Sequence, residues 1–216
     1  MKVKFFTVNP FQENTYLLYD DSNEGVIIDP GFFTSTEKEN VTSFLKEHNI
    51  KLQAVWLTHA HIDHILGLDF ITSDFKTPVL MHEKEVEVYE KMSPMASQMY
   101  NIPLNLPTTP TQFFKEGDLI SFGQQKLEVI FTPGHAPGHV VFVHHETGVI
   151  INGDVLFKGS IGRTDFPNSN HQDLVNSIQQ KLFKLPDHYV VYTGHGEPTS
   201  IGEEKRNNPF VGIGGK

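Results

Sequence analysis

The stretch Thr58-His59-Ala60-His61-Ile62-Asp63-His64 directly follows the apolar run Ala54-Val55-Trp56-Leu57. The apolar run predicts a buried strand. In an extended segment, residues two apart point the same way, so His59 and His61 can bind one metal ion at the end of this strand. The stretch therefore predicts a metal site at a strand end, where rigid scaffolds commonly present functional side chains.

Other acidic and imidazole residues extend this cluster. Asp63 and His64 lie where a helix is expected to begin, and the turn can aim them at a second point nearby. Three further candidates each follow a strand pattern and adjoin a glycine: His135 in Pro-Gly-His, Asp154 in Asn-Gly-Asp and His195 in Gly-His-Gly. Glycine permits close backbone approach at such loops. We therefore expect these residues to converge on one site.

The remaining histidines of the 12 have no such context. His139 begins a strand pattern four residues after His135, so we assign it a structural or supporting role beside the ligands. The others are interpreted as solvated or internally hydrogen-bonded side chains: His48, His82, His144, His145, His171 and His188.

The composition limits the classes of function. The chain has 216 residues, no cysteine and a formal net charge of -9. Without cysteine, any metal has to be held by imidazole and carboxylate, and disulfides and iron–sulfur clusters are excluded. The negative charge argues against binding to nucleic acid or to an anionic membrane. No run approaches the roughly 18 apolar residues of a membrane span, and no signal-peptide core is present. We expect a cytoplasmic protein.

Hydrophobic periodicity predicts an alternation of strand groups and helices. The predicted strands are Val3–Val8, Thr15–Leu18, Val26–Ile28, Ala54–Leu57, Val79–Met81, Leu119–Phe122, Leu127–Phe131, His139–Val143, Val149–Ile151 and Tyr189–Thr193. The first predicted helix lies between the third and fourth strands. Three more are predicted at Ile65–Ile71, Glu83–Lys91 and Asp173–Leu182. This order favours two packed sheets with outer helices over a doubly wound parallel sheet. No linker divides the chain, so one domain over residues 1–216 is expected.

Two local predictions concern the ends of helices. Thr36 is the expected N-cap of the first helix, because Glu39 follows three positions later as in a capping box. The stretch Ser93–Pro110 contains four prolines. Since proline interrupts helices and sheets, we expect an irregular, mobile segment there, which either borders a site or forms a long surface connection.

The motifs resemble those of a known family. The stretch Thr58–His64 is similar to the HxHxDH motif of the metallo-β-lactamase superfamily. Ile28–Gly31, Thr132–His135, Gly153–Asp154 and Gly194–Gly196 match its other signatures in the same order, over nearly the whole chain. The resemblance implies an α/β (α+β) fold, an αββα sandwich of two mixed β-sheets flanked by helices, with metal at one end of the sheets.

The resemblance also implies a set of ligands for two divalent metal ions. It places His59, His61 and His135 on one ion, Asp63, His64 and His195 on the other, and Asp154 between them. Asp29 is implied as a supporting residue near the site. Zinc is the expected metal, with iron or manganese as alternatives. Two divalent ions, two carboxylates and one hydroxide leave a net charge of about +1, which favours an anionic or carbonyl-bearing small molecule as substrate.

The expected chemistry is hydrolysis. Metal-bound water ionises near neutral pH and the metal polarises a carbonyl, so no serine or cysteine nucleophile is needed. Asp63 is a candidate for steering the attacking water or accepting its proton. The stretch Gly153–Phe166 resembles glyoxalase II, the hydroxyacylglutathione hydrolases, and especially their short bacterial relatives. This implies hydrolysis of a thioester such as S-lactoylglutathione.

The residues that bear on glutathione recognition match longer glyoxalases II only in part. Arg163 falls where longer glyoxalases II place a basic glutathione-binding residue, and its guanidinium can clamp a carboxylate. However, Asp165 lies where those enzymes have a tyrosine, and the chain ends about twenty residues after His195, without their helical C-terminal domain.

Two alternative activities share the motifs. A mononuclear iron persulfide dioxygenase of the same fold would use His59, His135 and Asp154. Hydrolysis of a lactone or a β-lactam is a third possibility. Neither the metal identity nor the oligomeric state follows from the sequence.

Overall fold

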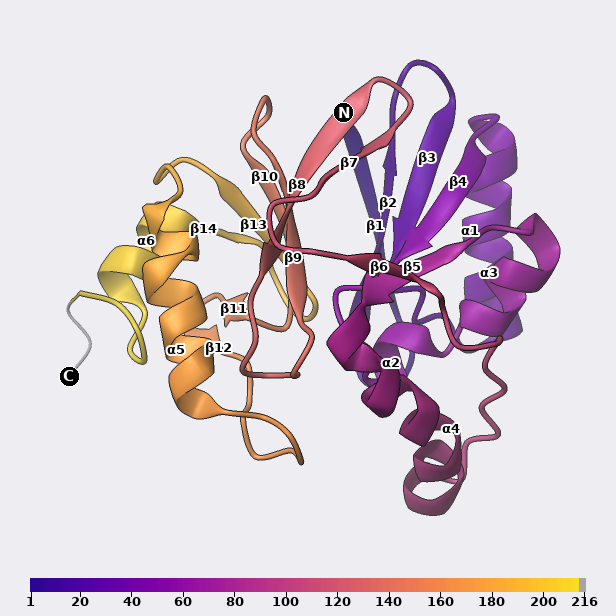
Figure 1. The fold of residues 1–216 in the computed structure, drawn as a ribbon. Coiled ribbons are helices and arrows are strands. Elements are labelled where there is room, and N and C mark those ends of the chain that lie inside the picture. The colour runs from indigo at the N-terminus through magenta and orange to yellow at the C-terminus, as the bar shows by residue number, and fades with distance from the viewer. Residues whose placement is uncertain (214–216) are drawn as a thin grey trace. The chain divides into compact units, whose positions relative to one another are not determined.

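The computed structural model describes residues 1–213, which form two compact units (Figure 1). The first unit contains residues 1–114 and 121–125, and the second contains residues 115–120 and those from 126 onward. The predicted single domain, 1–216, includes residues outside the described part and stays a prediction. None of the helices described between residues 1 and 213 is long and apolar enough to cross a membrane.

The first unit contains a mixed sheet of six strands in sequential order. The strands are β1 (Lys2–Val8), β2 (Glu13–Tyr19), β3 (Glu24–Ile28), β4 (Lys51–Trp56), β5 (Val79–His82) and β6 (Gln112–Phe114). The pairs β1–β2 and β2–β3 are antiparallel, whereas β3 to β6 run parallel to one another. Parallel neighbours require crossover connections, and helical segments supply each of them.

The helices of the first unit cover one face of its sheet (Figure 1). They are α1 (Ser35–Glu47), α2 (Ile62–Ile65), α3 (Leu68–Phe75), the 3-10 turn Glu83–Glu85 and α4 (Val86–Tyr100). Val41 of α1 and Ile71 of α3 share one apolar core with Leu17, Ile27 and Val55 from alternate sheet positions. The period of two in the strands and of three to four in the helices thus produces this core.

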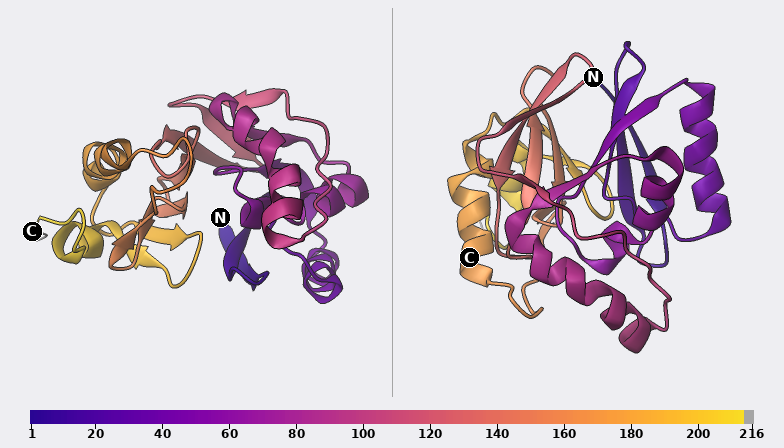
Figure 2. Two further views of the ribbon diagram at one scale, coloured as in Figure 1. Left: turned by 90° about the horizontal axis from the view of Figure 1, so that it is seen from below. Right: turned by 45° about the vertical axis from the view of Figure 1, so that its right-hand side comes forward.

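A second mixed sheet has the order β14-β13-β10-β9-β8-β7. Its strands are β7 (Leu119–Phe122), β8 (Gln125–Phe131), β9 (Val140–His144), β10 (Val149–Gly153), β13 (Val190–Thr193) and β14 (Thr199–Ser200). The sheet belongs to the second unit, except for the end of β7 and the first residue of β8, which fall within residues 121–125 of the first. A short hairpin, β11 (Leu156–Phe157) and β12 (Ser160–Ile161), follows β10. The helices α5 (His171–Gln180) and α6 (Ile201–Asn207) lie on one face of the sheet (Figure 2), with the 3-10 turn Leu182–Lys184 between them in sequence.

The predicted cap of the first helix was wrong by two residues. The N-cap is Thr34, whose hydroxyl accepts from Glu37 N–H while the Glu37 carboxylate accepts from Thr34 N–H. Thr34–Glu37 and Thr36–Glu39 have the same spacing, so sequence alone does not separate them. The earlier pair forms because the Glu37 carboxylate also accepts from the backbone N–H groups of Asn9 and Phe33.

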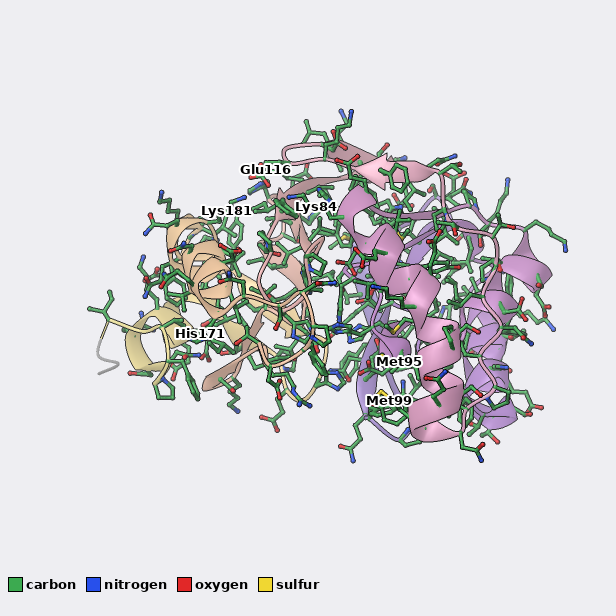
Figure 3. The ribbon with its side chains drawn as sticks, turned by 60° about the horizontal axis from the view of Figure 1, so that its bottom comes forward. Lys84, Met95, Met99, Glu116, His171 and Lys181 are labelled. Atoms are coloured by element: carbon green, nitrogen blue, oxygen red, sulfur yellow. The ribbon has the colours of Figure 1, made fainter. Side chains whose placement is uncertain are left out.

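The prediction of an irregular segment over Ser93–Pro110 was wrong for the first part of that stretch. The helix α4 continues through Pro94 to Tyr100. A proline removes only one helical hydrogen bond, and the buried face of α4, including Met92 and Ala96, keeps the helix in place. Met95 and Met99 project from the same helix (Figure 3). After Tyr100 the chain is irregular until β6, and Tyr89 and Ser93 donate hydrogen bonds to its carbonyls at Pro107 and Leu104.

Several short elements differ from the prediction or were missed. The predicted helix at Ile65–Ile71 is two helices, α2 and α3, which are separated around Gly67. The elements β6, β11, β12, β14 and α6 have two to seven residues and were not predicted. Segments this short carry too little periodicity to identify.

The cap assignment predicts a difference between two threonines. Thr34→Ala should lower the free energy of unfolding by about 1 kcal/mol, because it leaves the Glu37 N–H without its capping acceptor. Thr36→Ala is the matched control, since Thr36 is an exposed residue in the first turn of the same helix. Urea unfolding of both variants measures the two changes. Equal destabilisation would contradict the assignment.

Candidate metal centre

The sheet of the first unit brings its polar loops to one edge. The strands β3, β4 and β5 are parallel, so their carboxyl ends lie at the same edge. Asp29 directly follows β3, the stretch Thr58–His64 follows β4, and Glu85 follows β5 after two intervening residues. Open parallel sheets bind their ligands at this edge.

A buried carboxylate organises the histidine stretch. Asp29 is 2% exposed, and its Oδ1 accepts from Thr58 N–H at 2.7 Å. Its Oδ2 accepts from the Thr58 hydroxyl at 2.6 Å and lies 3.0 Å from His64 Nδ1. The Asp29 backbone is left-handed, with φ of 50°. The carboxylate binds the start and the end of the same stretch.

These contacts assign the tautomers of two imidazoles. The carboxylate of Asp29 can only accept, so His64 donates from Nδ1 and presents the lone pair of Nε2. Thr58 has one hydroxyl proton and donates it to Asp29, so its oxygen, 3.0 Å from His59 Nδ1, accepts from that nitrogen. His59 therefore also presents its Nε2 lone pair. Both rings are fully buried, with their centroids 4.1 Å apart.

The other two predicted ligands of this unit lie in the same turn. The His61 ring is 4.6 Å from the His59 ring between centroids, and Asp63 Oδ2 is 3.7 Å from His64 Nε2. Both side chains are partly exposed. Candidate ligand atoms of Asp29, His59 and His64 lie within 4.8 Å of one another.

Asn9 fixes the backbone of this turn. Its side-chain amide donates to the carbonyls of Gly31 and Asp63, each at 2.9 Å. It thereby joins the turn after β3 to the turn that carries Asp63. Gly31 is required at this position, because a Cβ there would lie 2.2 Å from both the Asp63 carbonyl and the Glu13 carboxyl.

A second buried acid, Glu13, lies behind His64. Its Oε1 is 3.9 Å from His64 Nδ1, and burial raises the pKa of the Glu13 carboxyl, against the opposing effect of His64. The Thr15 hydroxyl lies 2.8 Å from the Asp29 carbonyl and 2.9 Å from Glu13 Oε2. The Thr15 hydroxyl, as donor to these two acceptors, links the Glu13 carboxyl to the Asp29 backbone.

In the second unit, three predicted ligands lie together. Asp154 follows β10, and His195 follows the parallel strand β13, so both leave the same edge. Asp154 Oδ2 is 3.6 Å from His135 Nε2 and 3.5 Å from His195 Nε2. His135 Nδ1 is 2.8 Å from the Arg163 carbonyl, which can only accept. His135 therefore presents the lone pair of Nε2 beside the carboxylate.

His139 contacts a candidate ligand through the backbone. Its Nε2 accepts from Asp154 N–H at 3.1 Å, which leaves the proton on Nδ1, 3.2 Å from the Thr132 hydroxyl. The ring is fully buried. This bond positions the Asp154 backbone. The Arg163 side chain points instead to Asp165, with which it forms two hydrogen bonds.

The donor set in each unit fits a divalent metal ion. It consists of imidazole nitrogens and carboxylate oxygens, which suit zinc, iron and manganese. The Nδ1 atoms of His59, His64 and His135 are occupied by hydrogen bonds, as is usual for metal-binding imidazoles. The residues present therefore fit the group that the motifs imply.

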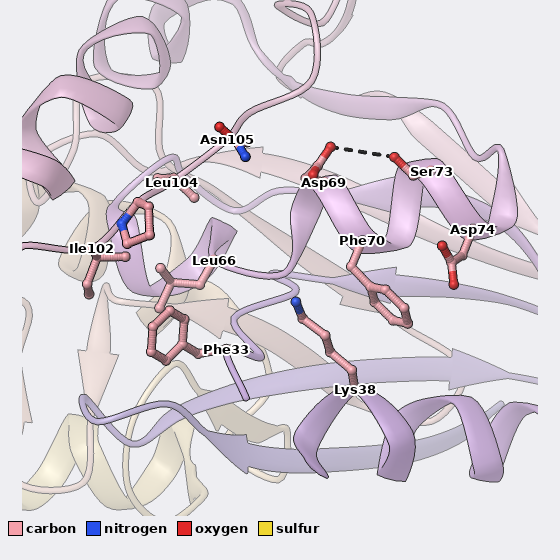
Figure 4. A pocket seen from close by; sticks show the side chains of 11 residues that line it. Phe33, Lys38, Leu66, Asp69, Phe70, Ser73, Asp74, Ile102, Leu104 and Asn105 are labelled. Atoms are coloured by element: carbon pink, nitrogen blue, oxygen red, sulfur yellow. Dashed lines mark hydrogen bonds between the residues drawn. The ribbon is translucent and has the colours of Figure 1, made fainter. Parts of the chain in front are cut away.

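A separate cavity of the first unit has a different lining. It measures about 370 Å³ and lies between α1, α3 and the chain after α4 (Figure 4). Its walls are mixed: Phe33, Leu66 and Leu104 are apolar, whereas Asp69 and Asn105 are polar, and Lys38 lies over the Phe70 ring. None of the described residues that line it is a predicted metal ligand.

Sequence reasoning missed Asn9, Glu13, Thr15 and Glu85. Glu85 is fully buried and its carboxylate accepts from Ala60 N–H at 2.8 Å. One signal was available for Glu13 and Thr15. The polar triplet Glu13-Asn14-Thr15 begins the otherwise apolar strand β2, and buried polar groups need specific partners.

The bridging role of Asn9 predicts an effect on metal binding. Asn9→Asp keeps the size and tolerates the left-handed backbone, but it replaces two N–H donors by an acceptor that faces two carbonyls. We expect affinity for zinc to fall by roughly tenfold to a hundredfold, as for other residues that support ligands. Titration of metal-free protein against a competing chelator measures this.

Asn23→Asp is the matched control for that experiment. Asn23 has the same left-handed backbone, with φ of 61°, and is exposed in the turn between β2 and β3. Equal zinc affinity in the two variants would show that Asn9 does not support the metal centre.

Comparisons with known proteins agree with this fold. The metallo-beta-lactamase superfamily model matches residues 8–195. The hydroxyacylglutathione hydrolase GloC of Haemophilus influenzae is 36% identical over 98% of both chains. The crystal structure of BLEG-1 B3 metallo-beta-lactamase matches with a TM-score of 0.89 and 35% identity, over 97% of this chain and 99% of that one. TTHA1623, solved in a di-iron-bound form, matches with a TM-score of 0.86 and 34% identity, over 97% and 100%.

These matches confirm the predicted fold class, two mixed β-sheets flanked by helices. The family model spans the histidine stretch, the Asp154 loop and His195. The chain belongs to the metallo-β-lactamase superfamily.

Proposed function

We propose that this protein is a metal-dependent hydrolase of thioesters, with S-lactoylglutathione or a related acyl thioester as substrate. Membership of the superfamily and the cluster of His and Asp side chains imply divalent metal ions. The observation that carries the proposal is the set of buried imidazoles whose Nδ1 atoms are occupied, so that Nε2 lone pairs are held ready beside carboxylates.

We assign the ligands of two metal ions by the superfamily pattern. His59, His61 and His135 would hold one ion, Asp63, His64 and His195 the other, and Asp154 both. Zinc is the proposed metal, and the di-iron form of TTHA1623 supports iron as an alternative. When bound, such ions supply activated water near neutral pH and polarise a carbonyl.

The chain's own residues would contribute position and proton transfer. Asp29 and Asn9 hold the turn that carries Asp63, whose carboxylate is partly exposed and can accept a proton from attacking water. His139 holds Asp154 through its backbone N–H. Pre-positioned ligands avoid reorganisation during the reaction.

The thioester is proposed from the similarity to hydroxyacylglutathione hydrolase GloC, which covers 98% of both chains. We infer a small anionic molecule as the partner, since two divalent ions, once bound, would leave the site with a net positive charge. The proposal includes neither nucleic acid nor a membrane as partner.

Release of free thiol from S-lactoylglutathione by the purified, zinc-loaded protein tests the proposal. Neutral acyl thioesters, a lactone and a β-lactam belong in the same panel, and oxygen uptake with glutathione persulfide tests the dioxygenase alternative on iron-loaded protein. We expect thiol release with thioesters. Absence of thiol release from every thioester would overturn the proposal.

The proposed ligands give a second prediction. His59→Ala and Asp154→Ala should each lower kcat/KM for the thioester by more than about a hundredfold, because loss of a ligand exceeds the effect of losing a supporting residue. Metal content, measured by elemental analysis, should fall in both.

His188→Ala is the matched control. His188 is exposed before β13, at the opposite end of that strand from His195. Unchanged metal content and activity in His59→Ala and Asp154→Ala, relative to this control, would contradict the ligand assignment.

A further inference from the structure

The loop after β12 lies directly beside one candidate metal ligand. His135 Nδ1 donates to the Arg163 carbonyl at 2.8 Å, and the Phe166 ring packs edge-on to the His135 ring, 5.8 Å between centroids. The start of the loop packs closely on the Asp154 backbone: a Cβ at Gly162 would lie 2.0 Å from the Asp154 carbonyl, and Gly162 N–H donates to the Val155 carbonyl at 3.0 Å. Side chains of residues 163–166 are therefore held next to the site.

The Arg163 guanidinium in this loop is occupied by a carboxylate of the same chain. Arg163 Nε donates to Asp165 Oδ1 at 2.8 Å, and Nη2 donates to Asp165 Oδ2 at 2.7 Å. The guanidinium carbon lies 4.4 Å from the centre of the Phe166 ring. This two-bond geometry is the one in which arginine recognises any carboxylate. The hydrogen bond from Arg163 lowers the pKa of Asp165 to about 2, so Asp165 is ionised at neutral pH.

The pair is accessible to an incoming molecule. The side chains of Arg163 and Asp165 are 65% and 64% exposed. Exposed ion pairs are weak, so a second carboxylate can replace Asp165 but has to compete with it. The stacking on Phe166 does not involve Asp165, and it keeps the guanidinium beside His135 after such a replacement.

We propose that Asp165 acts as an internal competitor for the carboxylate-binding face of Arg163, and that this pair sets how strongly the site prefers anionic over neutral thioesters. The proposal rests on the thioester hydrolysis proposed above. Carboxylate-bearing thioesters bind by displacing Asp165, whereas neutral thioesters leave the pair intact. Asp165 thus reduces selectivity for carboxylate-bearing substrates, and Arg163 is the residue that provides it.

The test compares selectivity ratios. The ratio is kcat/KM for S-lactoylglutathione divided by kcat/KM for an uncharged thioester of N-acetylcysteamine. Asp165→Asn removes the competing charge at nearly constant size, and we expect the ratio to rise by about twofold to fivefold, the range of an exposed ion pair. Arg163→Gln should lower the ratio, and Asp165→Asn should have no effect in the Arg163→Gln background. An unchanged or lower ratio in Asp165→Asn overturns the proposal.

Asp187→Asn is the matched control. Asp187 is a similarly exposed acid of the same unit, paired with Lys205 and Arg206. Its replacement changes the net charge of the protein by the same amount without touching Arg163. If Asp187→Asn raises the ratio as much as Asp165→Asn does, the effect belongs to net charge and the proposal fails.

A binding measurement separates this proposal from the proposed function. S-methylglutathione is a thioether that cannot be hydrolysed, and calorimetry gives its affinity for zinc-loaded wild type and for Asp165→Asn. Tighter binding by the variant supports the competition even if no thioester is hydrolysed, in which case only the proposed function fails. Thioester hydrolysis without tighter binding, or no binding by either protein, overturns the competition alone.

Discussion

The candidate ligands of the first unit depend on the hydrogen bonds that the Asp29 carboxylate accepts. It accepts from the backbone and the hydroxyl of Thr58 and from His64, and so ties both ends of the histidine stretch to the end of β3. A buried charge of this kind is costly unless its hydrogen bonds are satisfied, which explains why both oxygens are used. Its left-handed backbone, with φ of 50°, is a further cost that these hydrogen bonds offset.

The second unit uses a related arrangement with different residues. There the carboxylate is itself a candidate ligand, and His139 holds its backbone while the Arg163 carbonyl fixes the tautomer of His135. In both units a hydrogen bond on one side of a ring decides which nitrogen can bind metal on the other. With the tautomer fixed in this way, the imidazole needs no rearrangement of its protons before it binds a metal ion.

The sequence predicted the main strands and the loops that carry the candidate ligands, because both follow short-range rules. Apolar periodicity marked β3 and β4, and glycine marked the loops of Asp154 and His195. The rest depended on contacts between distant residues. Thr34 was preferred over Thr36 because Asn9 also reaches Glu37, and α4 passes through Pro94 because its buried face outweighs one lost hydrogen bond. Asn9 joins two turns 22 and 54 residues away, which no local pattern reveals.

The C-terminal helix extends this support to the loop of Arg163. The buried Glu204 carboxylate accepts from Gly159 N–H, and Asn208 donates to the Ser160 carbonyl, so α6 holds the hairpin that precedes Arg163. The hairpin in turn positions the Arg163 carbonyl, which accepts from His135 Nδ1. The residues after β13 thus act on the site through the backbone. Charge recognition is left to the exposed Arg163 and Asp165, so selectivity can change there while the metal-binding geometry is preserved.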